Sequence, residues 1–432
     1  MSKFHVKQTS GRRTRQNPGR RAEHASLERG SLALAMREAG QLIEKVIEGR
    51  NLSLAWEEAI AHAEWSDAER GAIRDLAWSA LRRFGRDDAT LRLLLTKPLP
   101  DSVRAVLLVA LARLESRPEQ SYVIVDQAVE AVGSFAPGLK GVANGVLRNR
   151  MRRAEDLLER IDEDETAQWC HPQWWIDRVR HDHPQRWQAL LHAGNAHPPM
   201  SVRINRRRSD VGQMKPRFEA TGVRAREIEP GALLLDHPMP VSQLPGFEQG
   251  WTSVQDAGAQ YAATLLGARN GERVLDACSA PGGKTAHILE LADVEMLALD
   301  LDPIRLARVR SNLERLGLEA QTKVADAARP DEWWDGRHFD RILADVPCSA
   351  SGVARRHPDI KWHRRDADIK GFAVTQSRLL DALWQTLAPG GTMLYATCSI
   401  FDEENGAQLS AFCARHDDAR RLSLHGRKEV QL

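Results

Sequence analysis

The stretch Arg273–Thr285 most constrains what this chain can fold into. Its residues pass from a short apolar run through small residues and two adjacent glycines into a helical pattern that continues to Leu291. This order predicts a strand, a tight turn and a helix. Glycine lets the backbone approach a ligand closely, and the free N–H groups at a helix start point toward that ligand. The stretch therefore predicts a ligand-binding turn at the end of a β-strand.

Two familiar ligand types fit this turn poorly. A phosphate-binding P-loop ending in Gly283, Lys284 and Thr285 would need another glycine five residues before Gly283, and that position holds Cys278. The dinucleotide fingerprint G-x-G-x-x-G is absent because Gly282 and Gly283 are adjacent. The turn favours a nucleoside-type cofactor, and a P-loop NTPase is the weakest of the functional hypotheses.

Length and composition indicate a globular protein of several domains. At 432 residues the chain is long enough for about two or three domains. Its hydrophobic fraction of 42% and charged fraction of 28% are ordinary for such proteins. No apolar run approaches the ~18 residues that cross a membrane, and the N-terminus lacks the apolar core of a signal peptide. We therefore expect a cytoplasmic protein with no membrane partner.

The five cysteines are few and widely spaced. They include no C-x-x-C pair, so neither a disulfide framework nor a zinc site is indicated. Reduced thiols and no bound metal are expected. The cysteines are Cys170, Cys278, Cys348, Cys398 and Cys413.

Residues 1–30 form a basic tail. They are rich in arginine with few acids to offset it, although the whole chain carries a net charge of only +2. Such a tail is expected to be disordered. It is either simply solvated or, as we favour, a basic arm that contacts nucleic acid phosphates. The arginines are Arg12, Arg13, Arg15, Arg20, Arg21 and Arg29.

Residues 31–155 predict an all-α bundle, because apolar residues recur there at helical spacing and turn residues at 97–101 and 135–138 separate the helices. The last helix has a more specific pattern. Gly141–Asn149 begins with small residues that permit close packing, and arginines follow up to Arg153. Together with 127–130, this stretch resembles the RNA-binding domain of the transcription antitermination factor NusB. From the residues alone, a basic helix end could instead complement the helix dipole.

Residues 156–250 predict a linker and a small α+β subdomain. Tryptophans cluster in a helical pattern, and a strand pattern at 197–205 leads directly into three arginines at 206–208. Aromatic rings interleaved with arginines suit single-stranded RNA, which is bound by stacking and phosphate contacts. Tryptophans at helical spacing are also typical of a core. The tryptophans are Trp169, Trp174, Trp175 and Trp187.

Residues 251–432 predict a doubly wound parallel α/β sheet, because strand and helix patterns alternate. The expected strands are 273–275, 296–299, 322–325, 341–344 and 392–397. Ligands of such sheets lie beyond the carboxyl ends of the strands, and acids stand at four of those ends: Asp276, Asp300, Asp326 and Asp345. A single acid after a strand is often a helix cap, but four in succession favour a site. Asp300 also lies about twenty residues past the glycines, where a carboxylate reaches ribose hydroxyls.

Two cysteines follow the last two expected strands. Cys348 comes after the fourth strand and Cys398 directly after the fifth. A single cysteine there is usually a small core residue. Adjacent strands would, however, bring both thiols to the same rim as the cofactor turn, which is the arrangement that covalent catalysis needs.

Four motifs together resemble the RNA cytosine-5 methyltransferases. They are D-A-C-S-A-P-G-G-K-T at 276–285, D-V-P-C-S-A-S-G at 345–352, R-R-H-P-D-I-K-W at 355–362 and Y-A-T-C-S at 395–399. The NusB-like front end narrows the resemblance to the RsmB (Sun) branch, which methylates small-subunit ribosomal RNA. The resemblance covers nearly the whole chain beyond the basic tail. It implies a Rossmann-like domain that uses S-adenosylmethionine, with rRNA as partner. The sequence does not determine the oligomeric state, for which a monomer is expected.

The resemblance also implies a role for each matching residue. Asp300 would hold the ribose of S-adenosylmethionine, Asp326 would lie by the adenine, and Asp345 would contact the cofactor and face the reacting centre. Cys398 would be the nucleophile and Cys348 the helper in its release. The methionine part of the cofactor would be held by Cys278, Ser279, Ala280, Pro281, Gly282, Gly283 and Lys284.

The chemistry explains why such a nucleophile is needed. Carbon 5 of cytosine is a poor nucleophile within an aromatic ring, so a thiolate adds at carbon 6 and makes an enamine whose carbon 5 can attack a methyl group. The target cytosine must be unpaired or flipped out.

Two departures from the family pattern stand out. Ser279 occupies a position where the family commonly has alanine. After the helical pattern near 408–413 the chain stops at Leu432, whereas the family continues into a final strand pair, so we expect the sheet to lack that pair. A non-catalytic RNA-binding or ribosome-assembly factor is therefore the alternative hypothesis.

Overall fold

The computed structural model describes residues 26–229 and 231–423 of the chain. The chain forms two compact units. One comprises the described residues up to Ala196 together with Val353–Asp366, and the other comprises His197–Gly352 and the described residues from Ala367 onward. Most of the predicted basic tail, residues 1–25, lies outside the described residues.

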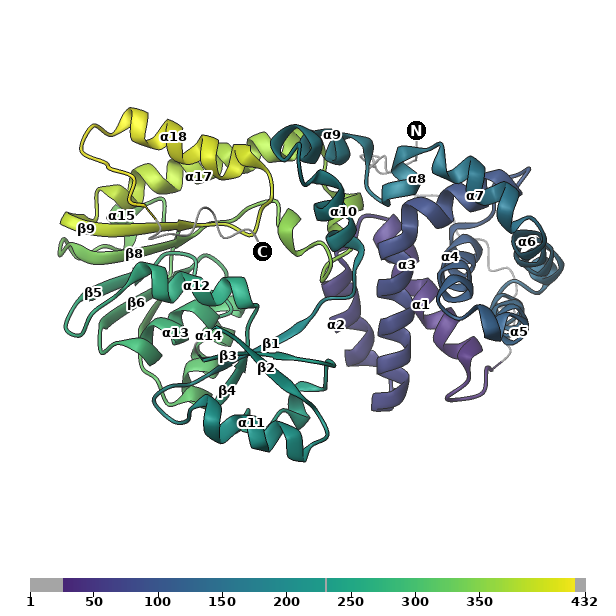
Figure 1. The fold of residues 1–432 in the computed structure, drawn as a ribbon, viewed down its shortest axis with the longest axis horizontal. Helices are drawn as coiled ribbons and strands as arrows, with labels where there is room; N and C mark the ends of the chain where they lie inside the picture. Colours follow the sequence, from purple (N-terminus) through teal and green to yellow (C-terminus); the bar gives the residue numbers. More distant parts are fainter. Residues whose placement is uncertain (1–25, 230, 424–432) are drawn as a thin grey trace, which may run out of the picture. The chain divides into compact units, whose positions relative to one another are not determined.

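The first unit is helical, as the sequence predicts (Figure 1). At the start of α3, Ser66 and Glu69 form a reciprocal capping box that satisfies two free N–H groups. The predicted break at 97–101 is confirmed, because α3 ends at Leu94 and α4 begins at Asp101. The helices are α1 (Leu32–Ile47), α2 (Leu52–His62), α3 (Asp67–Leu94), α4 (Asp101–Ser116), α5 (Ser121–Gly133), α6 (Lys140–Arg152), α7 (Ala154–Asp162), α8 (Glu165–Trp169), α9 (Gln173–Asp182), α10 (Trp187–Asn195) and the short α16 (Ile360–His363).

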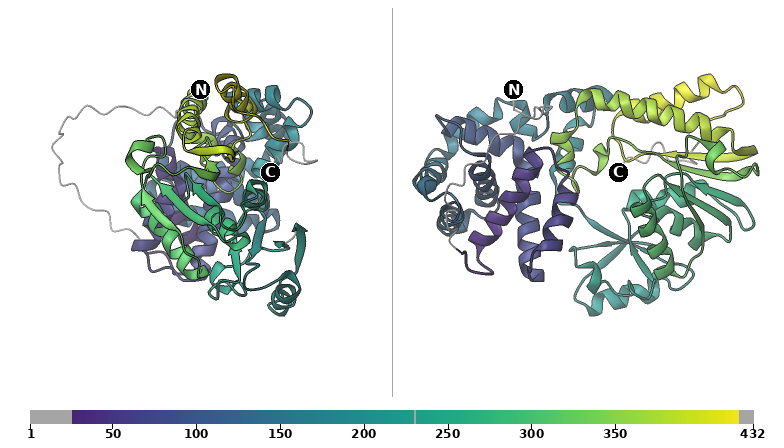
Figure 2. Two further views of the ribbon diagram at one scale, coloured as in Figure 1. Left: turned by 90° about the vertical axis from the view of Figure 1, so that its left-hand side faces the viewer. Right: turned by 180° about the vertical axis from the view of Figure 1, so that it is seen from behind.

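The core of the helical unit is an apolar cluster centred on α1, which packs against α3, α4 and α5 (Figures 1 and 2). Met36 and Ile43 of α1 are fully buried in it, and burial of such side chains contributes about 1.5–3 kcal/mol each. Of the clustered tryptophans, Trp175 is fully buried, which fits the core interpretation of that residue. Trp169 and Trp187 stack edge to face with ring centroids 5.1 Å apart.

The segment Val353–Asp366 completes this core from far along the chain. Trp362 of α16 packs against Phe84, with ring centroids 4.9 Å apart, and donates its indole N–H to the carbonyl of Leu81 at 3.1 Å. Gly85 makes room for it, since a Cβ at that position would lie 2.9 Å from the Trp362 ring.

Lys361 is the second anchor of the segment. Its side chain is fully buried, and its Nζ donates to the carbonyls of Arg82 and Cys170 and to the side-chain oxygen of Asn195, at 3.0, 2.9 and 2.6 Å. Burial lowers the pKa of Lys361 to about 7. An ammonium has three donors and no acceptor, so the three oxygens satisfy it completely.

The second unit contains a small antiparallel sheet in the order β2-β3-β1-β4. Its strands are β1 (Met200–Ile204), β2 (Ala225–Glu229), β3 (Ala232–Leu235) and β4 (Thr252–Val254). Helix α11 (Val211–Ala220) covers it with Met214 and Phe218, which are both fully buried. The predicted small α+β subdomain and the strand expected within 197–205 are confirmed.

The larger sheet has five parallel strands in the order β7-β6-β5-β8-β9. Every strand expected from the sequence is present. Helices α12–α14 lie on one face and α15, α17 and α18 on the other (Figure 1), so Val274 and Leu275 enter separate apolar clusters. This is the predicted doubly wound fold. The elements are α12 (Ala257–Leu266), β5 (Arg273–Asp276), α13 (Gly283–Leu291), β6 (Glu295–Asp300), α14 (Pro303–Leu316), β7 (Gln321–Val324), α15 (Pro330–Trp333), β8 (Phe339–Asp345), α17 (Asp366–Trp384), β9 (Leu387–Ala396) and α18 (Gly406–Arg415).

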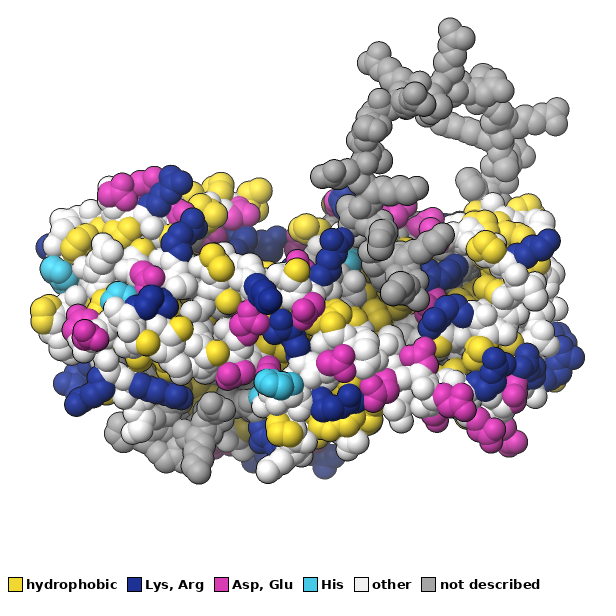
Figure 3. Space-filling model, turned by 90° about the horizontal axis from the view of Figure 1, so that it is seen from above, with side chains coloured by type: hydrophobic (Ala, Val, Ile, Leu, Met, Phe, Trp, Pro, Cys, Tyr) yellow, Lys and Arg dark blue, Asp and Glu magenta, His cyan; other side chains and the backbone are white. Residues whose placement is uncertain are grey.

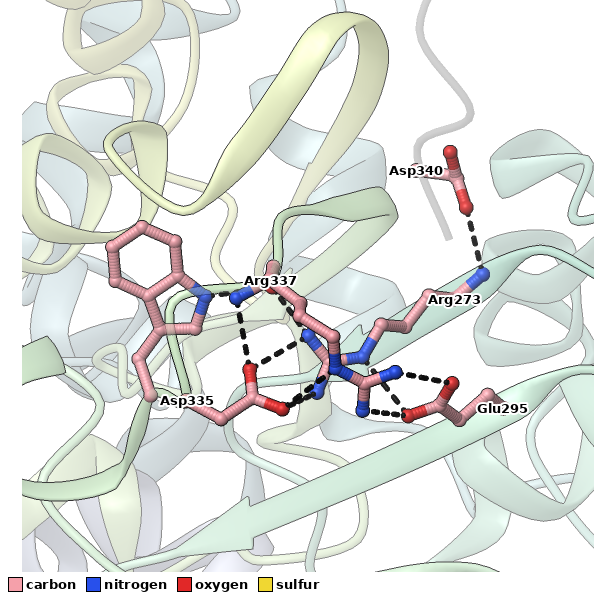
Figure 4. A network of polar contacts seen from close by, with 6 residues as sticks. Arg273, Glu295, Asp335, Arg337 and Asp340 are labelled. Atoms are coloured by element: carbon pink, nitrogen blue, oxygen red, sulfur yellow. Dashed lines mark hydrogen bonds and ion pairs between the residues drawn. The ribbon is translucent and has the colours of Figure 1, made fainter.

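A polar network closes the amino ends of β5 and β6 (Figure 4). The guanidinium of Arg273 donates to both carboxylate oxygens of Asp335, at 2.9 and 2.8 Å, and to Glu295 at 3.1 Å. Arg337 bridges the same two carboxylates. The hydrogen bonds from Arg273 hold the pKa of Asp335 well below its usual range. This network fixes the end of the sheet opposite to the carboxyl edge.

Basic and acidic side chains are interspersed on the face shown in Figure 3. Arginines at and after the end of α6 are also paired with acids, Arg150 with Glu115 at 3.1 Å and Arg153 with Asp156 at 2.6 Å. Part of the basic charge at the end of α6 is therefore already neutralised within the protein. No helix in the described part of the chain is long and apolar enough to cross a membrane.

Candidate active site

The turn between β5 and α13 carries the predicted cofactor residues at the carboxyl edge of the sheet. It contains a cis peptide bond between Ala280 and Pro281, and Gly282 has a φ of 96°. A Cβ at Gly282 would lie 3.2 Å from the Cα of Val309. Glycine is therefore required there both by the left-handed conformation and by the approach to α14. Helix α13 begins at Gly283, and its first N–H groups lie at the turn.

Asp276 and Ser279 present buried polar atoms to this turn. Thr285 donates to Asp276 Oδ2 at 2.6 Å, while Asp276 Oδ1 and Ser279 Oγ are buried and find no hydrogen-bond partner among the described residues. Burial raises the pKa of Asp276 to about 7. Buried polar atoms without partners are uncommon in proteins. The turn therefore fits a ligand that brings its own polar groups, such as the ammonium and carboxylate of an amino acid.

Asp300 and Asp326 lie at the same edge, at the end of β6 and just after β7. Asp300 is buried, and its Oδ2 accepts the N–H of Ala280 at 3.2 Å, so it braces the turn directly. Asp326 Oδ1 accepts the N–H of Ala328 at 3.0 Å, and its other oxygen lies 3.7 Å from Arg378. Both carboxylates are thus aligned with the turn by the parallel strands.

Lys284 and Asp345 form an ion pair at the rim. Lys284 Nζ lies 2.5 Å from Asp345 Oδ2, and both side chains are largely shielded from solvent. Burial lowers the pKa of Lys284, but the Asp345 carboxylate and neighbouring anions outweigh it and raise the pKa above its ordinary value. Lys284 is therefore a fixed positive charge beside Asp345. By contrast, burial raises the pKa of the Cys278 thiol, which makes it a poor nucleophile.

Cys348 and Cys398 lie side by side where β8 and β9 end, as the adjacency of their strands predicts. Their Sγ atoms are 3.2 Å apart, and the Cys398 N–H points to Cys348 Sγ at 3.4 Å. The hydrogen bond between the sulfurs raises the pKa of Cys348 well above its usual value and lowers that of Cys398. The positive charge of Lys284 also lowers the pKa of Cys398.

The structure adds two charged residues that sequence reasoning missed. Glu404 is fully buried and accepts hydrogen bonds from the residues that follow both cysteines, Ser349 and Ser399. Arg203 of β1 is buried and forks onto Glu290 of α13 at 2.8 and 2.7 Å. The sequence does contain a signal for the Arg203–Glu290 pair. An arginine within an apolar strand and a glutamate within an apolar helix are both unusual.

The remaining predicted groups are placed as follows. The motif at 355–362 belongs to the helical unit and forms α16 with its flanks. Within residues 26–229 and 231–423, no group of three or more His, Cys, Asp or Glu side chains is arranged to hold a metal ion.

Three family models match successive parts of the chain. The NusB family matches residues 35–152, a ferredoxin-like domain of RsmF/B-like methyltransferases matches 171–242, and 16S rRNA methyltransferase RsmB/F matches 263–432. The order of these matches is the order of the three parts expected from the sequence.

Curated relatives match over most of the chain. A ribosomal RNA small subunit methyltransferase B from Cronobacter sakazakii is 42% identical over 390 residues, which cover 88% of this chain and 90% of the relative. The protein of the same name from Escherichia coli is 41% identical over 389 residues, with the same coverage.

Solved structures share the fold. The crystal structure of PH0851 matches with a TM-score of 0.72 and 24% identity and covers 90% of this chain and 91% of its own. A methyltransferase homolog protein from Pyrococcus horikoshii matches with a TM-score of 0.52 and 28% identity and covers 60% and 82% of the two chains. The first likeness supports the fold alone.

Proposed function

Since the chain belongs to the family of 16S rRNA methyltransferases RsmB/F, we propose that it transfers a methyl group from S-adenosylmethionine to carbon 5 of a cytosine in small-subunit ribosomal RNA. The observation that carries this proposal is the pair of thiols at the ends of β8 and β9, with sulfurs 3.2 Å apart. Cytosine-5 methylation needs one thiol to add to the base and a second group to assist its release. Two adjacent thiols beside a cofactor turn supply both.

The cofactor proposal is supported by the turn. S-adenosylmethionine supplies an electrophilic methyl group when it is bound. The turn 278–284 and the unpartnered Asp276 Oδ1 and Ser279 Oγ would hold its amino-acid part. Asp300 would hold the ribose, and Asp326 would lie beside the adenine.

Cys398 is the proposed nucleophile. The hydrogen bond from Cys348 and the charge of Lys284 both favour its thiolate. The sulfur would form a bond to carbon 6 of the cytosine, and the ring electrons would move so that carbon 5 becomes nucleophilic while the ring nitrogen takes up a proton that it shares with the Asp345 carboxyl group. The Lys284–Asp345 pair would thereby stabilise the adduct.

Release reverses the addition. After carbon 5 has received the methyl group, its remaining proton passes to a base, the double bond between carbons 5 and 6 forms again as the Cys398 thiolate is expelled, and the ring nitrogen returns its proton to the Asp345 carboxylate. Cys348 assists this elimination, because its sulfur already contacts that of Cys398. The cytosine must be unpaired or flipped out to reach the thiols.

The other parts of the chain would bring the RNA. We assign rRNA contacts to residues 31–155, which match the NusB family, and to the α+β subdomain within 156–250. Residues 251–432 would carry the chemistry. Because its substrate is ribosomal RNA, the protein would act in the cytoplasm.

The test uses cysteine variants and labelled S-adenosylmethionine with small-subunit rRNA. We expect Cys398→Ala to lower methyl transfer at least about a thousandfold. Cys348→Ala should still add to the base but release it slowly, so that a covalent protein–RNA complex survives denaturing electrophoresis. Cys413→Ala, a cysteine on α18 that packs against an apolar cluster of the sheet domain, serves as the matched control.

Two results would redirect the proposal. Full activity of Cys398→Ala would remove it as the nucleophile. Tight rRNA binding by the unaltered protein without any methyl incorporation would favour a non-catalytic RNA-binding or assembly factor.

A further inference from the structure

A single buried carboxylate joins the two loops that carry the cysteines. Glu404 lies in a short 3-10 turn, Asp402–Glu404, after β9, and its side chain is fully buried. The first loop follows β8 and contains Cys348 and Ser349, and the second follows β9 and contains Cys398 and Ser399. Both serines come directly after their cysteine.

Both oxygens of Glu404 accept hydrogen bonds from these loops. Oε1 accepts the backbone N–H of Ser349 at 2.7 Å and the side-chain amide of Gln376 at 3.1 Å. Oε2 accepts the hydroxyls of Ser349 and Ser399, both at 2.5 Å. Gln376 also donates to the carbonyl of Pro347, the residue before Cys348, at 3.0 Å. The carboxylate therefore has four donors, and three of them come from the cysteine loops.

A third serine closes the network between the loops. Ser351 Oγ lies 3.1 Å from Ser349 Oγ and 3.0 Å from Ser399 Oγ, and it accepts the N–H of Ile400 at 2.8 Å. In all four of its hydrogen bonds Glu404 is the acceptor. It is therefore the common acceptor of the two loops.

We propose that Glu404 is a positioning residue that sets the separation of the Cys348 and Cys398 sulfurs by tying together the residues that follow them. The catalytic meaning of this separation rests on the proposed function, but the geometric claim does not. Glu404 forms no hydrogen bond to either sulfur and acts through Ser349 and Ser399.

The separation of the Cys348 and Cys398 sulfurs can be probed by disulfide formation, which does not depend on methyl transfer. Diamide oxidises two neighbouring thiols to a disulfide, taking up two electrons and two protons to become its hydrazine, and the rate depends on how often the sulfurs meet. We expect the unaltered protein to form the Cys348–Cys398 disulfide readily, with loss of two free thiols and a peptide cross-link visible by mass spectrometry.

Glu404→Ala should slow this cross-link about tenfold or more, because the loops lose their common acceptor. Glu404→Gln should stay within about threefold of the unaltered protein. Its amide oxygen can still accept from the Ser349 N–H and Gln376, and the serine hydroxyls can turn to accept from its NH₂ group. Glu314→Ala, on the exposed face of α14, is the matched control and should leave the rate unchanged.

Methyl transfer supplies the second readout. Glu404→Ala should lower kcat about tenfold or more without changing the KM for S-adenosylmethionine, since the cofactor turn is untouched. Cys398 is faced by Cys348, Asp345, Lys284 and Glu404, and the negative charge of Glu404 raises the Cys398 pKa. Glu404→Gln should therefore move the acid limb of the pH–rate profile to lower pH, which a merely structural role would not do.

Three outcomes decide the matter. An unchanged cross-linking rate in Glu404→Ala would overturn the proposal, whatever its activity. If that variant does not fold, Ser399→Ala removes one of the two hydroxyl donors to Oε2 and should slow the cross-link by about threefold; an unchanged rate there would also overturn it. Full activity of Cys398→Ala would refute the proposed function and leave the sulfur separation to be judged by cross-linking alone.

Discussion

Asp276 ends β5 with one carboxylate oxygen bonded to Thr285 and the other without a partner among the described residues. Its raised pKa follows from burial, with the nearby Asp345 adding to it. Because the folded pKa of about 7 lies above the ordinary 3.8, the folded state holds this proton more tightly. The resulting stabilisation is full below about pH 4 and is lost as the pH rises through 7. Asp276 therefore becomes charged near neutral pH, and this ionisation lowers the free energy of unfolding.

This titration predicts how cofactor binding depends on pH. A carboxylate attracts the ammonium of S-adenosylmethionine more strongly than a carboxylic acid does, so we expect its dissociation constant to fall as the pH rises from 6 to 8. Asp276→Asn should bind about tenfold more weakly at pH 8 and lose most of this dependence. Calorimetric titration without RNA measures both. An unchanged pH dependence in the Asn variant would contradict the assignment, and Asp293→Asn, an exposed acid, is the control.

Some residues of the candidate site could be predicted from the sequence, and others could not. The two thiols could be predicted because each follows a strand, and parallel strands align their ends. Glu404 could not, since its donors come from Ser349, Gln376 and Ser399, which lie in three separate elements. Only the folded chain brings those donors to one carboxylate.

Strand β1 and helix α13 are joined by a buried ion pair that reaches the cofactor turn. Arg203 forks onto Glu290, and its remaining nitrogen donates to the carbonyl of Gly283 at 2.7 Å and to the side chain of Gln255. Gly283 is the first residue of α13. The small sheet thereby holds the helix start against which the cofactor would lie.

We therefore expect Arg203→Lys to weaken S-adenosylmethionine binding about tenfold. Lysine keeps the charge but lacks the planar fork, so it cannot serve Glu290 and Gly283 together. Calorimetric titration gives the affinity, and circular dichroism checks that the fold is kept. Arg226→Lys, an exposed arginine on β2, should bind normally. Equal affinity of Arg203→Lys and the unaltered protein would show that the turn does not depend on this contact.

The strands themselves were well predicted, with one instructive difference. The sequence predicts the fifth strand at 392–397, but β9 starts at Leu387. Phe339 pairs with Leu387, and the next pair is Arg341 with Thr392, so residues 388–391 form an irregularity in the ladder. A proline and two glycines there indicate a turn when only local chemistry is considered. Strand β9 nevertheless resumes its pairing with β8 at Thr392.

At the level of the whole chain, the helical unit is built from two distant stretches of sequence. Residues 355–362 follow the Cys348 loop directly, and nothing local shows that they belong elsewhere. In the structure, Trp362 and Lys361 are buried in the helical unit. The three oxygens around Lys361 and the space left by Gly85 are among the features that reveal that role, and both require tertiary structure.

Lys361→Met tests this arrangement. The substitution leaves the carbonyls of Arg82 and Cys170 and the Asn195 side chain without their donor, which should lower the local opening free energy by about 3 kcal/mol. Amide hydrogen exchange in the middle of α3 should then accelerate on the order of 100-fold. Lys97→Met, an exposed lysine in the loop after α3, should exchange like the unaltered protein. Unchanged protection of α3 in Lys361→Met would show that Lys361 does not anchor the segment.

The shared core has a consequence for how the protein is made. A ribosome synthesises the chain from the N-terminus, and the helices up to α10 are complete long before Trp362 emerges. At ~5–20 residues per second, the wait for residues 353–366 is on the order of ten to thirty seconds. During that time the nascent helices expose the surface that Trp362 and Lys361 later cover. The helical unit, although first in the sequence, can reach its final stability only after the first cysteine loop has left the ribosome.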